Sequence, residues 1–366
     1  MNLVTDILIV GAGVTGLRLA GILNKDKCDY LVVEARDRIG GRVLSSALST
    51  LADGVYDMGP AWFWPGQPRV ADLAAKLGLT VFDQYAKGRM VFEDPSGAIR
   101  RDLEMAPMAG SLRIAGGLGA LTGGLATALP ADRVHLNTVV TGLTQTDDGI
   151  LAASAASDGP AAVRANKVVL AIPPRLAAER VAFDPVLPPE AHEAMRAVPT
   201  WMAGHAKVVA VYERPFWREA GLSGDAISRR GPLAEIHDAS PHAAGEGALF
   251  GFVGVPAGAR RAAGRDLTDA AIRQLTALFG PQASQPLAVH IQDWAAERFT
   301  ATKADEMPPA GHPTYGLPAP MQDLWGGHLV LASAETGQQH GGFIEGALEA
   351  AEAAAHALLT GMVDPV

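Results

Sequence analysis

The sequence predicts an α/β fold that opens with a Rossmann-like unit. The first observation is a strand, a glycine-rich turn, a helix and a second strand in succession, within roughly 30 residues at the N-terminus. The second is the length, because at about 150 residues per domain a chain of 366 residues allows two domains. The third is a series of further strands that ends in one long amphipathic helix near the C-terminus. Together they predict a Rossmann-like domain with additional sheet structure.

The N-terminal unit follows from local patterns. Residues 6–10 form a short apolar run suited to a buried parallel strand. The turn GAGVTG follows at 11–16, and helical spacing continues over 14–23. Residues 30–33 form a second, β-branched run that ends at Glu34. This order of elements predicts a strand–turn–helix–strand unit.

Beyond this unit the pattern alternates between helices and strands. Helices are predicted at 67–79, 119–130, 267–279 and 343–359. Strands are predicted at 134–143, 151–154, 168–172, 206–212, 249–255 and 329–333, with turns and short strands over 82–101 and a loop over 311–320. Pro173 and Pro174 end one block of strands and predict a crossing between domains.

Composition excludes several classes of protein. The chain is 48% hydrophobic and 19% charged, which is too apolar and too low in charge for a disordered protein. Its 39 acidic residues outnumber its 30 basic ones, so no excess of positive charge is available to bind nucleic acid. The single cysteine, Cys28, excludes an internal disulfide and cysteine-based zinc sites, and no metal is expected.

The longest run without charge argues against a membrane span. Residues 114–131 contain five glycines and a proline. A spanning helix needs about 20 mainly apolar residues. The apolar residues near the N-terminus lack a preceding basic segment and lead directly into a glycine turn, so they predict a first strand and not a signal peptide. We therefore expect a soluble, cytoplasmic protein.

Three glycines in the first turn predict binding of a dinucleotide. Gly11 permits the tight turn, Gly13 lets a pyrophosphate approach the backbone, and Gly16 allows close packing of helix on strand. The free N–H groups at the helix start then face an anion. Glu34 either accepts hydrogen bonds from ribose hydroxyls or merely ends an exposed strand. The order and spacing of the strand, turn, helix, second strand and acid favour dinucleotide binding.

The stretch EARDRIGGR at 34–42 has two interpretations. Its paired glycines and Arg42 can bring backbone and a charge-assisted donor to a phosphate. Alternatively, the stretch is a solvated charge run followed by a loop. Read alone, these residues leave both interpretations open.

An ordered series of matches begins with these two motifs. After GAGVTG and EARDRIGGR come DMGPAW at 57–62, PGQ at 65–67, LAIPP at 170–174, FDPVLP at 183–188, Lys207, PFW at 215–217, AET at 334–336 and GFIEGA at 342–347. The series resembles the flavin-containing amine oxidases, the monoamine and polyamine oxidase group. Each match is loose, but the ordered set is specific to that family.

The resemblance implies a fold of two interleaved domains. A Rossmann-like FAD-binding domain would use residues 1–70, 115–175 and 300–366. A smaller sheet-based substrate domain, α+β in character, would use residues 71–114 and 176–299. Larger family members carry a helical insertion between 79 and 116 and a C-terminal membrane tail. Neither is found in this sequence, which predicts a reduced lid and a more open cleft.

The resemblance also assigns FAD to particular residues. The pyrophosphate would contact Gly11, Gly13, Val14, Thr15 and Gly16. The adenosine end would contact Glu34, Ala35, Arg36 and the backbone of Val139, and phosphate would contact Gly41 and Arg42. The flavin ring would lie beside Gly59, Pro60, Ala61 and Trp62, with Glu335 at the ribityl and pyrophosphate arm. The last helix would direct backbone N–H groups at the flavin C2 carbonyl and N1 from Gly342, Phe343 and Ile344, because a helix N-terminus stabilises negative charge.

Lys207 is the candidate catalytic residue. It lies in the apolar run AKVVAV, where a buried lysine is costly unless paired. In the family the matching lysine holds a water at flavin N5. The alternative is a lysine at a strand end whose stem reaches solvent. The PFW stretch at 215–217 favours the position beside the flavin.

Two departures from the family affect the site. Monoamine oxidases tether their flavin through a cysteine, and that position falls near Lys303, so we expect non-covalent FAD. Of two aromatic rings that often face each other above the flavin, only Phe343 is kept, because the partner position falls near Ala304. His340 stands where a tryptophan is common, so Phe343 and His340 are the candidate substrate contacts. Further candidates for the cleft are His205, His312, Tyr315 and Trp325.

The predicted function is therefore FAD-dependent oxidation of an amine. Hydride passes from a C–N carbon to flavin N5, the imine hydrolyses, and O2 reoxidises the flavin to give H2O2. The alternatives are a related FAD enzyme that acts on C–C bonds, such as a desaturase, and a catalytically idle FAD-binding protein. A pyridine-nucleotide dehydrogenase is disfavoured, since EARDRIGGR and the C-terminal motif are flavin features. The expected partners are a small amine and O2, with no nucleic acid and no membrane.

Overall fold

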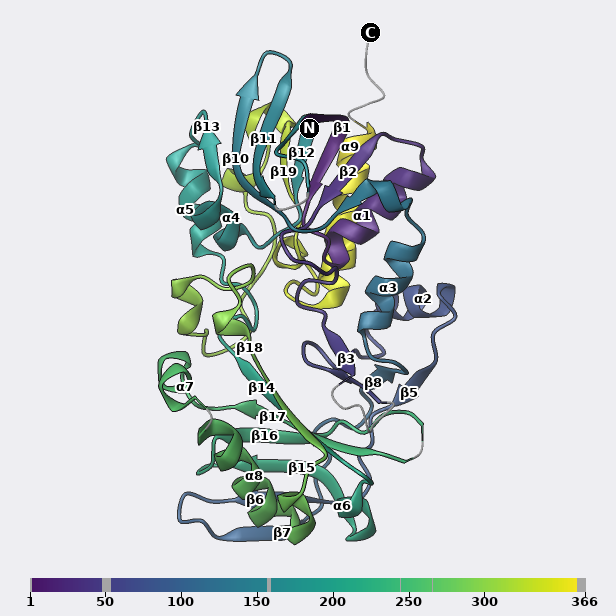
Figure 1. The fold of residues 1–366 in the computed structure, drawn as a ribbon, viewed down its shortest axis with the longest axis vertical. Helices are drawn as coiled ribbons and strands as arrows, with labels where there is room; N and C mark the ends of the chain where they lie inside the picture. Colours follow the sequence, from purple (N-terminus) through teal and green to yellow (C-terminus); the bar gives the residue numbers. More distant parts are fainter. Residues whose placement is uncertain (1, 48–53, 157–158, 244, 265, 361–366) are drawn as a thin grey trace.

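The molecule consists of two sheets that lie at opposite ends of its long axis (Figure 1). The computed structural model describes residues 2–47, 54–156, 159–243, 245–264 and 266–360. The chain leaves the first sheet for the second twice, over 89–103 and again over 206–293, and returns each time. The two domains are therefore interleaved, and the fold is the mixed α/β fold that the sequence predicts.

The first sheet has the strand order β13-β10-β11-β12-β1-β2-β9, with β19 paired to β12. Its parallel centre consists of β1 (Asn2–Val10), β2 (Tyr30–Val33), β9 (Val134–His135), β12 (Ala162–Leu170) and β19 (Leu329–Leu331). A hairpin of β10 (Thr138–Thr146) and β11 (Gly149–Ala156) adds antiparallel strands, and β13 (Ala182–Asp184) pairs in parallel with β10.

Burial on both faces explains the continuous apolar run at residues 7–10 of β1. Ile7 and Ile9 pack into one hydrophobic cluster, and Leu8 and Val10 pack into another on the opposite face. The first cluster lies under α1 (Val14–Lys25), α3 (Gly119–Thr127) and α9 (Ile344–Thr360), with α2 (Pro68–Lys76) against α9. The second lies under α4 (Pro174–Arg180) and α5 (Pro189–Ala197). A parallel strand covered by helices on both sides has this pattern.

The second sheet is mainly antiparallel and has the order β18-β14-β17-β16-β15-β6-β7. Its strands are β6 (Arg89–Glu93), β7 (Ile99–Leu103), β14 (Ala206–Tyr212), β15 (Leu222–Ser228), β16 (Leu233–Asp238), β17 (Gly247–Val253) and β18 (Ala288–Asp293). The helices α6 (Phe216–Glu219), α7 (Ala257–Ala263) and α8 (Asp266–Phe279) accompany it. Two small pairs, β3 (Ser45–Ala47) with β4 (Val55–Asp57) and β5 (Val81–Asp83) with β8 (Leu112–Ile114), lie along the connecting segments.

The crossing between the sheets differs from the one expected at Pro173 and Pro174. Pro174 begins α4, and the segment α4–β13–α5 packs on the first sheet through Ala177, Ala191 and Met195. The chain enters the second sheet only at β14, so residues 176–197 lie with the first sheet. The same holds for residues 71–76, because α2 packs on α9. The pair of prolines ends a strand and starts a helix, which is a local signal that carries no information about domains.

Several elements of the second sheet have no clear signal in the sequence. β15, β16 and β18 are short, and charged or polar residues interrupt their apolar positions. Pairing with their neighbours places them in the sheet: β18 pairs with β14, β16 with β17, and β15 with β16 and β6. No helix in the described part of the chain is both long and apolar enough to span a membrane.

Substitutions at two glycines of α1 can test how closely this helix packs on the glycine turn that precedes it. A Cβ at Gly16 would lie 1.9 Å from the carbonyl oxygen of Gly11, whereas a Cβ at Gly21 meets nothing within 4 Å. We expect Gly16→Ala to lower the free energy of unfolding by about 3 kcal/mol or more. Gly21→Ala should raise it by about 0.5–1 kcal/mol through helix propensity. Urea unfolding followed by circular dichroism measures both, and equal changes would contradict the described packing.

Candidate active site

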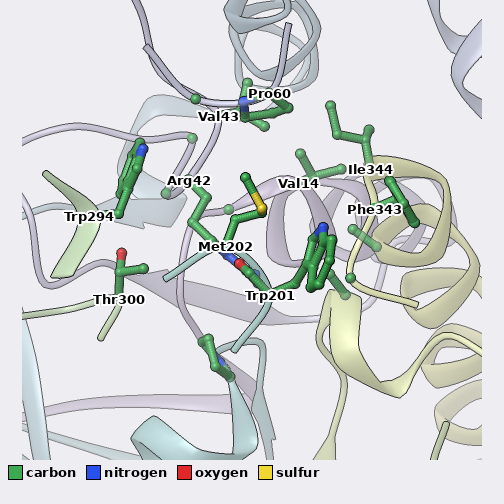
Figure 2. A pocket seen from close by; sticks show the side chains of 18 of the residues that line it. Val14, Arg42, Val43, Pro60, Trp201, Met202, Trp294, Thr300, Phe343 and Ile344 are labelled. Atoms are coloured by element: carbon green, nitrogen blue, oxygen red, sulfur yellow. The ribbon is translucent and has the colours of Figure 1, made fainter. Parts of the chain in front are cut away.

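A cavity of about 340 Å³ lies between the two sheets. Its lining combines residues that directly follow β1, β2, β12 and β19 with residues of β14 and β17. Figure 2 shows Trp294 and Thr300 on one side of it and Phe343 and Ile344 on the other. The carboxyl ends of parallel strands are the usual position of ligand sites in such sheets.

The glycine turn leaves one wall of the cavity open. Gly11 has a φ of 109°, which a residue with a side chain rarely adopts, and closely approaches Ala171. Gly13 is the N-cap of α1 and provides no side-chain cap, and a Cβ at this position would meet nothing within 4 Å. The first N–H groups of α1 therefore face the cavity beside Val14 and Thr15, which suits an anion.

Glu34 is buried at the end of β2 and faces this turn. Its Oε2 accepts a hydrogen bond from Ala12 N at 2.8 Å, and its Oε1 accepts one from Arg36 N at 3.0 Å. The Arg36 side chain donates to Thr300 Oγ1 at 2.7 Å and lies over the ring of Phe299. Glu34 and Arg36 both line the cavity, so the acid is not at the end of an exposed strand.

An ion pair joins the second glycine motif to the C-terminal segment. Arg42 Nη1 and Nη2 donate to the two carboxylate oxygens of Glu335 at 2.6 and 3.0 Å. Glu335 is fully buried and also accepts from Trp201 N and Ser333 Oγ. The carboxylate of Glu335 raises the pKa of Arg42 against the opposing effect of burial. Glu335 is therefore held behind Arg42 and does not line the cavity.

Lys207 is buried on β14 and lines the cavity from the second sheet. Its Nζ donates to the carbonyl oxygens of Gly59 at 2.6 Å and Asp57 at 3.1 Å, and lies 4.3 Å from the centre of the Phe250 ring. Burial lowers the pKa of Lys207 from 10.5 to about 7, with the Asp57 carboxylate opposing that shift. The interpretation of Lys207 as a lysine that reaches solvent is wrong.

The segment 57–62 passes between Lys207 and the glycine motifs. A Cβ at Gly59 would lie 2.0 Å from the carbonyl oxygen of Arg42, so only glycine fits. The next three residues line the cavity, and Trp62 is fixed by a hydrogen bond from its Nε1 to Gln84 Oε1 at 2.8 Å. Pro60 and Ala61 present small apolar surfaces beside it.

Aromatic side chains that the sequence did not connect meet near the start of α9. His312 stacks on Phe343 with ring centres 4.9 Å apart and an angle of 15°. Trp201 contacts the edge of His312 at 4.6 Å and lies 6.3 Å from Phe343. Trp201 and Met202 enter the cavity from the turn before β14, where Met202 has a φ of 62°. A tight turn without an apolar period gave no signal for them.

Most of the predicted cofactor residues line this one cavity, namely Gly11, Gly13, Val14, Thr15, Glu34, Arg36, Gly41, Arg42, Gly59, Pro60, Ala61, Trp62, Gly342, Phe343 and Ile344. The structure places Gly16, Ala35, Val139, Glu335 and His340 outside the lining. Gly16 instead packs against Gly11, and Val139 lies in β10. Lining residues that sequence reasoning missed include Trp64, Gln67, Trp201, Met202, Phe252, Trp294, Phe299 and Thr300.

The remaining candidate residues also divide into those that line the cavity and those that do not. His205 lines the cavity, whereas His312 and Tyr315 pack behind Phe343 and Gly342. Trp325 lies against Phe183 in the second hydrophobic cluster of the first sheet and does not line the cavity. Lys303 and Ala304 are exposed on a short 3₁₀ helix (Lys303–Glu306) and do not line the cavity. Within the described ranges, no group of three or more His, Cys, Asp or Glu residues is placed to hold a metal.

Fold and cavity together define a dinucleotide-type Rossmann protein whose site is completed by a second sheet. The sequence profile of the NAD(P)-binding Rossmann-like domain matches residues 9–77. The profile of the flavin containing amine oxidoreductases matches residues 88–359, which is most of the chain. The chain belongs to this family of flavin-dependent oxidoreductases, as the ordered motifs predicted.

Curated relatives align over nearly the whole chain. A protein of Mycobacterium tuberculosis named as flavin-containing monoamine oxidase AofH is 29% identical, covering 96% of this chain and 95% of its own length. Putrescine oxidase of Kocuria rosea is 26% identical over 81% of this chain and 83% of its own. The pig flavin-containing amine oxidase B is 24% identical, covering 98% of this chain and 86% of its own length.

Solved structures share the fold. Wild-type putrescine oxidase bound to putrescine has a TM-score of 0.79 and 22% identity, covering 98% of this chain and 100% of that one. Cyclohexylamine oxidase from Brevibacterium oxydans has a TM-score of 0.79 and 20% identity over 98% of this chain and 100% of its own. These likenesses confirm the predicted architecture of a Rossmann-like domain and a sheet-rich second domain.

The lowered pKa of Lys207 predicts how stability depends on pH. The folded chain loses the Nζ proton near pH 7, whereas the unfolded chain keeps it up to about pH 10.5. Between these values the unfolded state binds more protons, so the wild type should gain stability relative to Lys207→Met as pH rises from 7 to 9. The gain is at most about 1.4 kcal/mol per pH unit.

Urea unfolding of both proteins at pH 6, 7, 8 and 9 measures this difference. Lys25→Met, at an exposed position of α1, is the matched control and should follow the wild type at every pH. A constant difference between wild type and Lys207→Met would show that Lys207 does not titrate in this window.

Proposed function

We propose that this protein binds FAD non-covalently and oxidises the C–N bond of an amine. One observation carries the proposal: a single cavity has an uncapped helix N-terminus at one end and a buried lysine with a pKa near 7 at the other. The first feature suits a pyrophosphate and the second suits a group that exchanges protons near neutral pH. Membership of the family supplies the flavin.

The residues of the cavity fit an FAD in an extended position. The space at Gly13 that a side chain would fill is where a pyrophosphate meets the N–H groups of α1. Glu34 would receive the adenosine ribose, and Gly41 and Arg42 would face phosphate. Arg42 already has its charge balanced by Glu335, so its approach to phosphate would come from its outer face.

The flavin ring would lie between the segment 59–62 and the start of α9. The first N–H groups of α9, near Phe343 and Ile344, would stabilise negative charge on the ring by about 0.3–2 kcal/mol. Glu345 is the acidic residue of the first turn, but its carboxylate is turned to Arg69 N and Val70 N of α2. The helix terminus therefore keeps its positive end for a ligand.

A covalent link has no support in the described lining, which contains no cysteine. Cys28 lies after α1 and packs at the edge of the first cluster, and burial raises the pKa of its thiol. The position that carries the tether in monoamine oxidases falls near the exposed Lys303. Non-covalent FAD is therefore the form we propose.

When bound, the flavin would supply the redox chemistry for oxidation of a C–N bond, with O2 as electron acceptor and H2O2 as the reduced product. Lys207 contributes at one atom. Two hydrogens of its Nζ are used by the carbonyls of Asp57 and Gly59, so the neutral amine has a free lone pair and the ammonium has a third hydrogen. With a pKa near 7, Nζ can hold a water and exchange a proton with it.

The binding site for FAD can be tested by filling the space at Gly13. We expect Gly13→Val to fold like the wild type, because its backbone is extended and the site is open, and to bind FAD at least about tenfold more weakly. Titration with FAD, followed by flavin fluorescence, measures the affinity. Unchanged affinity would place the pyrophosphate elsewhere.

Gly21→Ala, on the same helix and away from the cavity, is the matched control and should bind FAD as the wild type does. Acid precipitation of the FAD-loaded protein should leave a yellow supernatant and a colourless pellet. Yellow retained in the pellet would mean a covalent flavin.

Amine oxidation is tested by mixing the FAD-loaded protein with primary amines under nitrogen. The flavin absorbance near 450 nm should bleach and return on admitting O2, with one H2O2 formed per turnover. Lys207→Met should slow the cycle by about 10²-fold or more, while Lys25→Met leaves it unchanged. Bleaching by no amine would favour the idle FAD-binding protein, and bleaching only by a substrate that loses hydrogen from adjacent carbons would favour the C–C enzyme.

A further inference from the structure

A buried histidine with two carboxylate partners lies in the second sheet, outside the described lining of the cavity. His237 of β16 is 1% exposed. Its Nδ1 lies 2.7 Å from Oδ1 of Asp225, and its Nε2 lies 2.8 Å from Oε1 of Glu235. Asp225 belongs to β15, which pairs with β16, whereas Glu235 precedes His237 by two residues on β16 itself. The ring of His237 therefore joins β15 to β16.

The contacts of both ring nitrogens decide the charge of His237. An ionised carboxylate only accepts hydrogen bonds, so each nitrogen must carry a hydrogen and the ring is an imidazolium. Burial opposes this charge, but the hydrogen bonds and the attraction of Asp225 and Glu235 outweigh it and raise the pKa of His237 above 6.5. The hydrogen bond from His237 also lowers the pKa of Glu235. The second oxygen of Asp225, Oδ2, is buried and has no hydrogen-bond partner among the described residues, so this carboxylate depends on its pairing with His237.

Two aromatic side chains pack on His237 from other elements. Trp62 stands nearly perpendicular to it, with ring centres 5.2 Å apart and an angle of 85°. Phe250 of β17 lies 5.5 Å from His237 and 5.0 Å from Trp62. A cation within about 6 Å of an aromatic ring is attracted to it, so the charge on His237 strengthens both contacts. Of these three rings only that of Trp62 lines the cavity.

Other charged groups near this cluster have partners of their own. Asp238 follows His237 on β16, and its carboxylate accepts two hydrogen bonds from Arg218, each of 2.8 Å. Lys207 approaches Phe250, with its Nζ 4.3 Å from the ring centre. Since the pKa of Lys207 is about 7, this lysine is a second group that titrates beside the aromatic rings. A test of His237 must separate the two.

We propose that His237, fixed as an imidazolium between two carboxylates, is a positioning residue for Trp62, and that loss of its proton weakens this support. Without the Nε2 hydrogen a lone pair would face Glu235, whose side chain is 48% exposed and can turn to water. Asp225 is buried and stays in place, so the ring is then held from one strand only. The attraction between the ring and Trp62 falls at the same time. That Trp62 faces a flavin rests on the proposed function, whereas its support by His237 does not.

The direction of the pH dependence follows from the raised pKa of His237. Its proton stabilises the folded chain fully below pH 6.5, and this contribution is lost as pH rises through the pKa of the folded state. Trp62 should therefore be held firmly at pH 6 and more loosely well above pH 7.

Fluorine NMR of the full chain, labelled with 5-fluorotryptophan and with FAD present, tests the support of Trp62 directly. The chain has six tryptophans, and Trp62→Phe assigns the signal of interest. We expect this signal to shift between pH 6 and 9.5 with a midpoint above pH 6.5, and to stay constant in His237→Gln. Lys207→Met should keep the shift, which separates His237 from the lysine. His356→Gln, at an exposed position of α9, is the matched control and should titrate as the wild type does.

Glu235→Gln tests the same support at a half-exposed position, which the fold should tolerate. The amide keeps the size of the side chain but removes the charge that favours the imidazolium. We expect the midpoint of the Trp62 signal to fall by about half a pH unit or more, while Glu193→Gln, exposed on α5, leaves it unchanged. The proposal is overturned if the Trp62 signal does not titrate in the wild type, if it titrates equally in His237→Gln, or if Glu235→Gln has no effect.

Affinity for FAD separates this proposal from the proposed function. Titration with FAD at pH 6.5, followed by flavin fluorescence, should show about threefold or more weaker binding by His237→Gln than by the wild type, because Trp62 would lie beside the flavin ring. Equal affinities, with a Trp62 signal that titrates as expected, would contradict the proposed place of the flavin ring and leave the support of Trp62 standing. Absence of FAD binding by the wild type would contradict the proposed function, and the fluorine signals of the chain alone would still decide the role of His237.

Discussion

The burial of Lys207 between two backbone carbonyls is the constraint on which the site depends. The ammonium belongs to β14 of the second sheet, and the carbonyls of Asp57 and Gly59 belong to a segment that leaves the first. A buried amino group needs hydrogen-bond partners whether it is neutral or charged, so these two contacts hold the two parts of the chain together at this point. Asp57 extends the contact through Leu118 N to α3. The cavity is the space that remains around this junction.

The ion pair of Arg42 with Glu335 provides the second junction. It connects residues 293 positions apart and also holds the backbone of Trp201, through an N–H donated to Glu335 and a carbonyl that accepts from Arg42. Breaking one partner of such a pair leaves a buried charge, which is strongly destabilising. The pair thus fixes the turn that brings Trp201 and Met202 into the cavity. Glu335, which was expected to contact the cofactor, instead holds Arg42 in place, and Arg42 lines the cavity.

The aromatic surroundings of Phe343 differ from the pair of facing rings that the sequence led us to look for. Ala304, where the partner ring was expected, is exposed and does not line the cavity, while Phe343 stacks with His312 and approaches Trp201. The ring stacked on Phe343 is therefore His312, and Trp201 from the turn before β14 lies farther away. Trp62, Trp64 and Phe252 also line the cavity.

The sequence by itself determined the Rossmann unit, the family and many of the residues that line the cavity at the glycine turn. Residues 11–16 and Glu34 follow strand ends directly, so local patterns predict where the glycines and the acid lie. Tertiary structure decided the rest. Trp201, Phe252 and Trp294 come from different elements of the second part of the chain, and pairing of β14 with β17 and β18 brings these elements to the same cavity. Glu335 and Gly16 lie outside the lining of the cavity, because Glu335 pairs with Arg42 and Gly16 packs against Gly11. Contacts between distant segments have no period in the sequence, which is why the contribution of the second sheet to the cavity became visible only in the folded chain.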